Sequence, residues 1–161
     1  MVNVAQWSLM KKIILGLAVL IIIWIGWALF LGENKATEAI RELPDGQLEI
    51  VNENDEEVQL DIKIGSNATN LNNVKPELLS ETVIYITSKY SASATRIYED
   101  ISQDIQVAFF GPEDELLKIF DIPANTTQKI TPEKRYQHIL IAPDGFFEEN
   151  NISVENGSKI K

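Results

Sequence analysis

The feature that most constrains this chain is an uninterrupted apolar run near its N-terminus. Residues 13–32 read IILGLAVLIIIWIGWALFLG and contain no charged side chain. A helix of about twenty residues extends about 30 Å, which matches the hydrocarbon core of a bilayer. In lipid the backbone must satisfy its own hydrogen bonds, and a helix does so within one segment. The run therefore predicts a single transmembrane helix, with the lipid bilayer as the first partner of the chain.

Two other interpretations fit this run less well. A cleaved signal peptide has a shorter apolar region and a small-x-small cleavage site. The exit of this run, residues 30–34, reads FLGEN and has no such site. A buried core helix normally carries a polar face, and residues 13–32 carry none. We therefore expect an uncleaved anchor.

The flanking charges predict the orientation of the anchor. Lys11 and Lys12 directly precede the run, and no acidic residue comes before them. The segment that follows the run mixes both signs of charge. Because positively charged flanks remain on the cytoplasmic side, residues 1–12 are predicted to be cytoplasmic and the C-terminal domain extracytoplasmic. The predicted localisation is the cell membrane, crossed once.

The composition limits the chemistry of the remaining chain. There is no cysteine, which excludes disulfides, thiolate metal sites and cysteine nucleophiles. All 24 acidic residues follow residue 32, together with 12 of the 14 basic ones, so the last 129 residues carry a net charge of −12. A surface this acidic repels nucleic acid and anionic lipid headgroups. We expect no nucleic-acid partner.

The pattern after the apolar run predicts a small β domain. Residues 33–46 are expected to form a linker that ends at the helix breaker Pro44-Asp45-Gly46. The domain would then span residues 47–161, where short apolar runs alternate with turns. Helical turns are predicted at 76–79 and 146–150, and strands at 47–51, 57–64, 82–87, 95–98, 105–110, 115–122, 136–142 and 154–160. The fold class is mostly β: one N-terminal transmembrane helix followed by a small β-barrel or sandwich domain.

The second half of the chain resembles a known family. Residues 105–119, IQVAFFGPEDELLKI, resemble the segment LDIAFLDADGRVVEI of the uncharacterised protein family also called domain of unknown function 192. Residues 138–146, HILIAPDGF, resemble its YVLELPAGW, and residues 148–157, EENNISVENG, resemble its closing ERHGIKVGD. The chain is identified as a divergent member with an N-terminal anchor. The resemblance implies a fold and no reaction, because the family has no well-established one.

The same comparison points to an edge of the domain where a ligand site could lie. The family's Phe-Trp-Met-x-Asn-Thr falls on residues 96–101, and its Pro-Leu-Asp falls on residues 104–106. A concave pocket at this edge would bind a small molecule or a carbohydrate. The candidate ligand-binding residues are Tyr85, Arg96, Tyr98, Glu99, Asp100, Asp104 and Gln106.

Few side chains of this chain suit catalysis. His138 is the only histidine, so a two-histidine metal site or a standard hydrolytic triad cannot form within one chain. No residue close to it in the sequence supplies the orienting partner that catalysis requires. Glu99, Asp100 and Asp104 would support a carboxylate-dependent hydrolase if they lay buried and close together. The acidic stretch 52–57 lacks the glycine and the spacing of an EF-hand, so we expect a solvated hairpin loop.

Four Asn-x-Ser/Thr sequons lie in the domain that is predicted to be extracytoplasmic. Their acceptors are Asn67, Asn125, Asn151 and Asn156. They agree with an exported surface that is glycosylated, although a bacterial host would usually leave them bare.

Together these features predict a membrane-anchored extracytoplasmic accessory subunit or interaction module without catalytic activity, cofactor or bound metal. Its partner would be another membrane protein. The alternative is a small-molecule or carbohydrate-binding protein that uses a cavity near residues 96–106. The third hypothesis is the carboxylate-dependent hydrolase.

Overall fold

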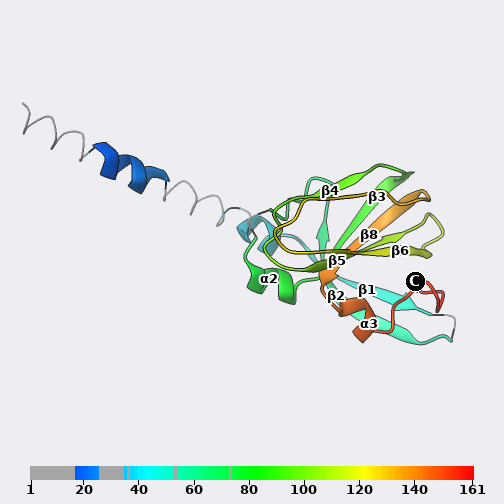
Figure 1. Cartoon of the computed structure of the whole chain (residues 1–161). Coiled ribbons are helices and arrows are strands. Elements are labelled where there is room, and N and C mark those ends of the chain that lie inside the picture. The colour runs from blue at the N-terminus through cyan, green and yellow to red at the C-terminus, as the bar shows by residue number, and fades with distance from the viewer. Residues whose placement is uncertain (1–16, 26–34, 36, 53, 73) are drawn as a thin grey trace, which may run out of the picture. The chain divides into compact units, whose positions relative to one another are not determined.

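The computed structural model describes residues 17–25, 35, 37–52, 54–72 and 74–161 (Figure 1). The chain divides into two compact units, Met1–Lys35 and Ala36–Lys161, which are described separately. In the first unit, residues 17–25 form a helix in which every side chain is exposed. Its large apolar side chains, from Leu17 to Ile25, are 49% to 73% exposed.

The expected anchor lies only partly within the part of the chain that is described. Residues 13–16 and 26–32 fall outside it, and so does the expected cytoplasmic segment 1–12. Among the helices of the described residues, none is both long enough and apolar enough to cross a membrane.

The second unit is built mainly from β-strands, as the sequence predicted. Its elements are β1 (Asp45–Val51), β2 (Glu57–Gly65), α2 (Pro76–Glu81), β3 (Ile84–Ala92), β4 (Arg96–Tyr98), β5 (Ile105–Phe110), β6 (Leu116–Ile122), β7 (Gln128–Ile130), β8 (Tyr136–Pro143), α3 (Phe146–Glu149) and β9 (Lys159–Ile160). Seven strands form one sheet in the order β6-β5-β8-β3-β2-β1-β9, and β4 pairs with β7 in a second, small sheet. Among the described strand pairs, only β2 and β3 run parallel.

The large sheet curls until its two edges meet at one end. The short strand β9 pairs with β1 at one edge, and Lys159 bridges to Glu115, at the entry to β6, at the other edge. Two backbone bonds reinforce the closure: the Leu116 amide donates to the Ser158 carbonyl at 2.9 Å, and the Ile160 amide donates to the Asp114 carbonyl at 3.0 Å. The result is a half-barrel, which confirms the predicted β-barrel-like domain.

Strand β5 lies between two hydrophobic cores. Alternate side chains of a strand point to opposite faces of the sheet. Val107 and Phe109 therefore enter one core, which also contains residues of β3, α2, β4 and β7. Ala108 and Phe110 enter the other, together with residues of β1, β2 and Phe147 of α3. Burial on both faces explains why residues 105–110 read as a nearly continuous apolar run.

The domain begins earlier than the sequence suggested. Residues 37–41 form a helix whose inner side chains, Thr37 and Ile40, are 5% and 1% exposed. The Thr37 hydroxyl accepts a hydrogen bond from the Lys75 amide at 3.4 Å, and Leu43 packs against the core that contains Ile40. Much of the expected linker 33–46 is thus part of the compact unit, which starts at Ala36 rather than at residue 47.

Three strand predictions differ from the structure. Residues 88–92 lie outside the predicted strand 82–87 but extend β3, because the register shifts between Thr87 and Ala92 and Ala92 still pairs with Tyr136 of β8. Strand β7 has no apolar run and pairs only through three residues of β4, so no pattern predicted it. The last strand is restricted to Lys159–Ile160, since residues 154–157 form a turn. The helical turns α2 and α3 lie where they were predicted.

Candidate functional site

Two of the predicted ligand-binding residues, Arg96 and Tyr98, line a cavity of about 230 Å³, which we call the Arg96 pocket. The pocket lies where β4 meets the loop that follows β2. It is lined by Asn67, Thr69, Asn70, Leu71, Asn72, Ile86, Thr95, Arg96, Ile97, Tyr98 and Ile141. Three asparagine amides and two threonine hydroxyls supply neutral hydrogen-bonding groups, and Ile86 and Ile141 supply apolar surface.

The charge of the Arg96 pocket is unlike that of the rest of the domain. Arg96 is the one charged residue among the described side chains that line it. The chain carries 24 acidic residues, and none of these described lining residues is acidic. The pocket therefore presents one positive charge among neutral polar groups.

The guanidinium of Arg96 is only partly satisfied. Its Nη2 donates to Oδ1 of Asn67 at 3.1 Å, and Nδ2 of Asn67 donates to Oγ of Ser88 at 3.0 Å. The Nε of Arg96 is buried and has no hydrogen-bond partner among the described residues. A buried donor without a partner costs about 1–3 kcal/mol. An acceptor that bound to Nε would remove this cost.

Tyr98 lines the same pocket as Arg96. Tyr98 is 8% exposed. Burial raises the pKa of Tyr98 to about 12, against the opposing effect of the positive charge on Arg96. The phenol is therefore protonated at neutral pH and can donate a hydrogen bond.

The three carboxylates predicted at this edge do not form a buried cluster. Glu99, Asp100 and Asp104 are all exposed, and none of them lines the Arg96 pocket. Asp104 accepts a hydrogen bond from the Ala124 amide at 2.7 Å, which fixes a loop. The condition that we set for a carboxylate-dependent hydrolase, burial of a close acidic pair, is therefore not met by these residues.

Gln106 serves the opposite face of the sheet. It is 3% exposed, and its Nε2 donates to Asp121 at 3.0 Å and to Glu148 at 3.2 Å. Its Oε1 accepts from the Phe147 amide at 3.4 Å. These bonds hold the start of α3 against β5. Gln106 is consequently a structural residue of the domain rather than a lining residue of the pocket.

Tyr85 also points away from the Arg96 pocket, and it contacts His138. The Tyr85 hydroxyl lies 2.7 Å from Nδ1 of His138, and the two rings stack with centroids 5.7 Å apart. Thr87 Oγ1 lies 3.0 Å from the same nitrogen, and Asp114 Oδ1 lies 3.1 Å from Nε2. The sequence predicted no orienting partner among the neighbours of His138 along the chain, and its partners come instead from β3 and from the β5–β6 turn.

The contacts of His138 fit a neutral imidazole. Burial lowers the pKa of His138, while the carboxylate of Asp114 acts in the opposite direction. A neutral ring would donate from Nε2 to Asp114 and accept at Nδ1 from Tyr85, whose own pKa is raised by burial. This assignment of the tautomer follows from the hydrogen bonds. The arrangement ties β3, β8 and the turn at Asp114 together.

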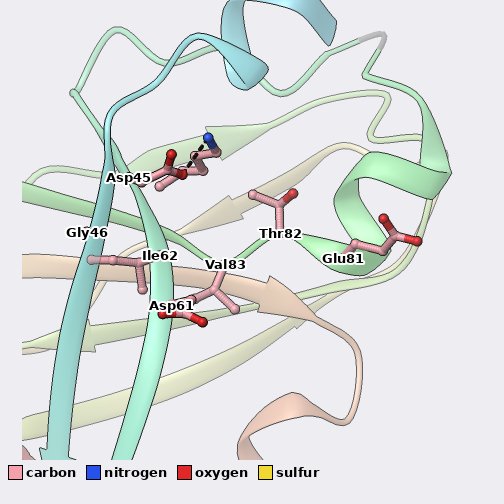
Figure 2. A pocket seen from close by; sticks show the side chains of 8 residues that line it. Asp45, Gly46, Asp61, Ile62, Glu81, Thr82 and Val83 are labelled. Carbon is pink, nitrogen blue, oxygen red and sulfur yellow. Dashed lines mark ion pairs between the residues drawn. The ribbon is translucent and has the colours of Figure 1, made fainter.

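A second cavity, of about 390 Å³, lies where β1 and β2 meet the segment before β3 (Figure 2). Its polar lining includes Asp45, Asp61, Lys63 and Glu81. Nζ of Lys63 forms an ion pair with Oδ1 of Asp45 at 2.6 Å, and a dashed line in Figure 2 marks an ion pair at this cavity. The same ammonium donates to the Arg41 carbonyl at 3.4 Å and to the Leu43 carbonyl at 3.3 Å. These three contacts tie both the end of helix 37–41 and the start of β1 to β2, so the polar lining of this cavity has a structural role.

Other predicted sites have varied surroundings. Asn125 is exposed, in a left-handed turn with φ of 55°. The other sequon acceptors have bonded side chains: Asn67 as described above, Asn151 to Glu56 at 3.0 Å, and Asn156 to Ser158 at 2.6 Å. Glycosylation stays a prediction for all four.

In the acidic loop, Oδ1 of Asn52 accepts bonds from the amides of Asn54 and Glu56, which confirms a hairpin loop. Within the described residues, no cluster of His, Asp or Glu side chains is suited to hold a metal ion.

Comparison with known proteins shows the fold alone. No family model matches the chain, and no curated protein matches it. A solved structure from Sinorhizobium meliloti, described as a "putative transcription regulator", is 7% identical with a TM-score of 0.64, and the match covers 74% of this chain and 94% of that one. A protein of unknown function from Novosphingobium aromaticivorans is 13% identical with a TM-score of 0.61, over 74% of this chain and 86% of that one. Identities this low carry no functional argument.

Proposed function

We propose that this protein is a membrane-anchored extracytoplasmic module that acts as an accessory subunit or interaction domain and has no catalytic activity of its own. The observation that carries the proposal is the helix at residues 17–25, whose apolar side chains are exposed all round. Each large apolar side chain gains about 1.5–3 kcal/mol when it leaves water. A helix without a polar face is therefore unfavourable in water and suited to lipid.

The surrounding sequence supports a membrane environment for this helix. It lies inside the apolar run 13–32, which is long enough to span a bilayer, and Lys11 and Lys12 precede that run. The proposed topology is an N-terminus in the cytoplasm and a domain outside. Extraction of membranes with alkaline carbonate should leave the chain in the pellet. Release into the supernatant would contradict the anchor.

The absence of cysteine allows the orientation to be tested directly. Ser8→Cys places one thiol before the lysine pair, and Ser93→Cys places one in the exposed loop after β3. A membrane-impermeant maleimide applied to intact cells should label Ser93→Cys alone. Labelling of Ser8→Cys should require permeabilisation. The reverse pattern would refute the proposed orientation while leaving the anchor in place.

The accessory role predicts a partner in the same membrane. Mild detergent extraction at native ionic strength should co-purify one membrane protein in a fixed ratio with this chain. A clean monomer, after crosslinking in intact membranes as well, would contradict the role.

As a second candidate function, we propose that the domain binds a small molecule or carbohydrate in the Arg96 pocket. The cavity, the buried and unpartnered Nε of Arg96 and the lack of acidic groups in the described lining favour this function. Calorimetric titration of the detergent-solubilised chain with neutral and charged sugars tests it. Asn72→Trp should fill the cavity and abolish binding without lowering the thermal midpoint by more than a few degrees.

We further propose that the chain is a divergent member of the domain of unknown function 192 family. The resembling segments coincide with whole elements: residues 105–119 cover β5, the turn and most of β6, and residues 138–146 run from β8 to the start of α3. A sequence profile built from close relatives of this chain should align with the family over both segments without gaps. An alignment that needed gaps within a strand would contradict the relationship.

A further inference from the structure

The guanidinium of Arg96 has a specific unfilled edge. The Nε–H and one N–H of Nη2 point in the same direction in any arginine, and together they match the two oxygens of a carboxylate. In this structure Nη2 donates to the single Oδ1 of Asn67, and Nε has no partner among the described residues. One amide oxygen cannot replace a pair of carboxylate oxygens at this edge.

We propose that the Arg96 pocket binds a small hydroxylated carboxylic acid, of the size of a uronic acid, whose carboxylate takes both Nε and Nη2 of Arg96 and displaces the Asn67 amide. This inference rests on the second proposed function, ligand binding in the same pocket. Asn67 then acts as a placeholder that keeps the guanidinium in position while the pocket is empty.

Asn67 is well suited to move aside. It is an exposed residue of the loop after β2, and its side chain is held by one bond from Arg96 and one to Ser88. Both bonds lie at the surface, where water replaces them at little cost. A ligand carboxylate would replace one bond from the guanidinium to a neutral amide oxygen with two parallel bonds in which both partners are charged.

The charge of the pocket selects a carboxylate over a phosphate. A phosphate monoester carries about −1.5 to −2 charges at pH 7, and the described lining offers one cation. The residues after the apolar run carry a net charge of −12, so an uncompensated second charge would be repelled. A planar monoanion leaves no charge uncompensated. A neutral hydroxyl has one oxygen and would accept from only one of the two donors, Nε and Nη2 of Arg96.

The other lining residues of the pocket suit a small hydroxylated ligand. Asn70 and Asn72 offer amide donors and acceptors, and Thr95 offers a hydroxyl. Tyr98 also lines the pocket, and its protonated phenol can donate a hydrogen bond. Ile86 and Ile141 provide apolar surface for the C–H face of a sugar ring. A volume of about 230 Å³ accommodates one such ring and excludes a chain of them.

The experiment is calorimetric titration of the detergent-solubilised full chain with D-glucuronate, D-galacturonate, D-glucuronamide, D-glucose and glucose 6-phosphate. Glucuronamide has the shape of glucuronate without its charge. We expect at least one of the two uronates to bind at least about tenfold more tightly than glucuronamide, glucose or glucose 6-phosphate, which corresponds to the loss of one charge-assisted pair.

Three variants separate this mechanism from simple charge attraction. Arg96→Lys keeps the charge and loses the paired donors, so uronate affinity should fall about tenfold or more. Asn67→Ala should raise uronate affinity, because the placeholder is gone. Ser88→Ala is the matched control, since it weakens the hold on Asn67 without touching the guanidinium, and it should raise affinity by less than Asn67→Ala.

Each outcome decides between the claims. If glucuronamide or glucose binds as tightly as both uronates, ligand binding stands and the carboxylate assignment is overturned. Tighter binding of glucose 6-phosphate overturns it as well. If Asn67→Ala lowers uronate affinity, Asn67 is a ligand-binding residue and the placeholder role is wrong. If none of the five compounds binds, both the inference and the second proposed function fail for this class of ligand.

Discussion

Ile40 allows a quantitative test of where the domain begins. It is 1% exposed and belongs to the core that includes Leu71, Val74 and Leu79. Truncation of a buried isoleucine to alanine costs about 2–5 kcal/mol, the spread reflecting how far the site can collapse. Helix 37–41 lies at the start of the compact unit and can move inward in part. We therefore expect Ile40→Ala to lower the free energy of unfolding by about 3 kcal/mol.

The measurement is urea unfolding of the full chain in detergent, followed by circular dichroism in the β-sheet region. All three tryptophans precede residue 33, so tryptophan fluorescence does not report on the domain. The matched control is Ile97→Ala, the same change at a side chain that is 53% exposed, which should cost less than about 1 kcal/mol. If Ile40→Ala costs no more than Ile97→Ala, helix 37–41 is not part of the folded unit, and our placement of the domain boundary is refuted.

Three further predictions concern side chains outside the Arg96 pocket. Because burial holds the pKa of His138 below its ordinary value of 6.5, the unfolded chain takes up this proton first as the pH falls, so stability should decline as the pH falls through 6.5. His138→Gln should flatten that decline in urea midpoints, and an unchanged slope would contradict it. Lys63→Met should lower the free energy of unfolding by about 1 kcal/mol, because the carbonyls at the end of helix 37–41 lose their cation. A urea midpoint equal to that of the wild type would show that Lys63 does not stabilise this helix end. Asn52→Ala should cost about 1–2 kcal/mol in the same assay through lost hydrogen bonds in the β1–β2 loop, whereas Asn54→Ala, at a neighbouring exposed position, should cost little.

Much of the fold could be predicted because local patterns and tertiary structure agree. Strand β5 was predicted at its observed bounds because both faces are buried and the segment is apolar throughout. Strand β2 was predicted from alternation, although Ile64 at its end is 40% exposed rather than buried. Strand β7 could not be predicted, since its three residues are strand only because β4 lies beside them. The parallel pairing of β2 with β3 depends on the path of the connecting loop and leaves no local pattern.

The candidate site was predicted in part, and strand alternation explains the errors. Arg96 and Tyr98 share a face of β4 and line one pocket. Gln106 stands between Ile105 and Val107, which enter the core on the pocket side, so its side chain points to the other face. Tyr85 stands between Ile84 and Ile86 in the same way. Counting alternation from these isoleucines would have excluded Tyr85 and Gln106 before the structure was known.

Asn67 could not have been found from local sequence. Its only signal was a sequon, yet it contacts Arg96, which lies 29 positions further along the chain. The loop that carries it is polar and irregular, and such loops are positioned by the strands that flank them. A side-chain contact of this kind depends on tertiary structure, and the pocket becomes visible only once β2, β3 and β4 are placed together.

Under the proposed topology, the anchor and the surface charge of the domain act in opposite directions. The apolar run would hold the domain at the membrane, while a net charge of −12 is repelled by anionic headgroups within about one Debye length, roughly 8–10 Å at physiological salt. A domain held close but not attracted to the lipid surface keeps its faces available to other molecules. The same repulsion disfavours anionic ligands at long range, so the Arg96 pocket would have to select its carboxylate by short-range geometry. The paired edge of one arginine in a lining without acidic groups meets that requirement.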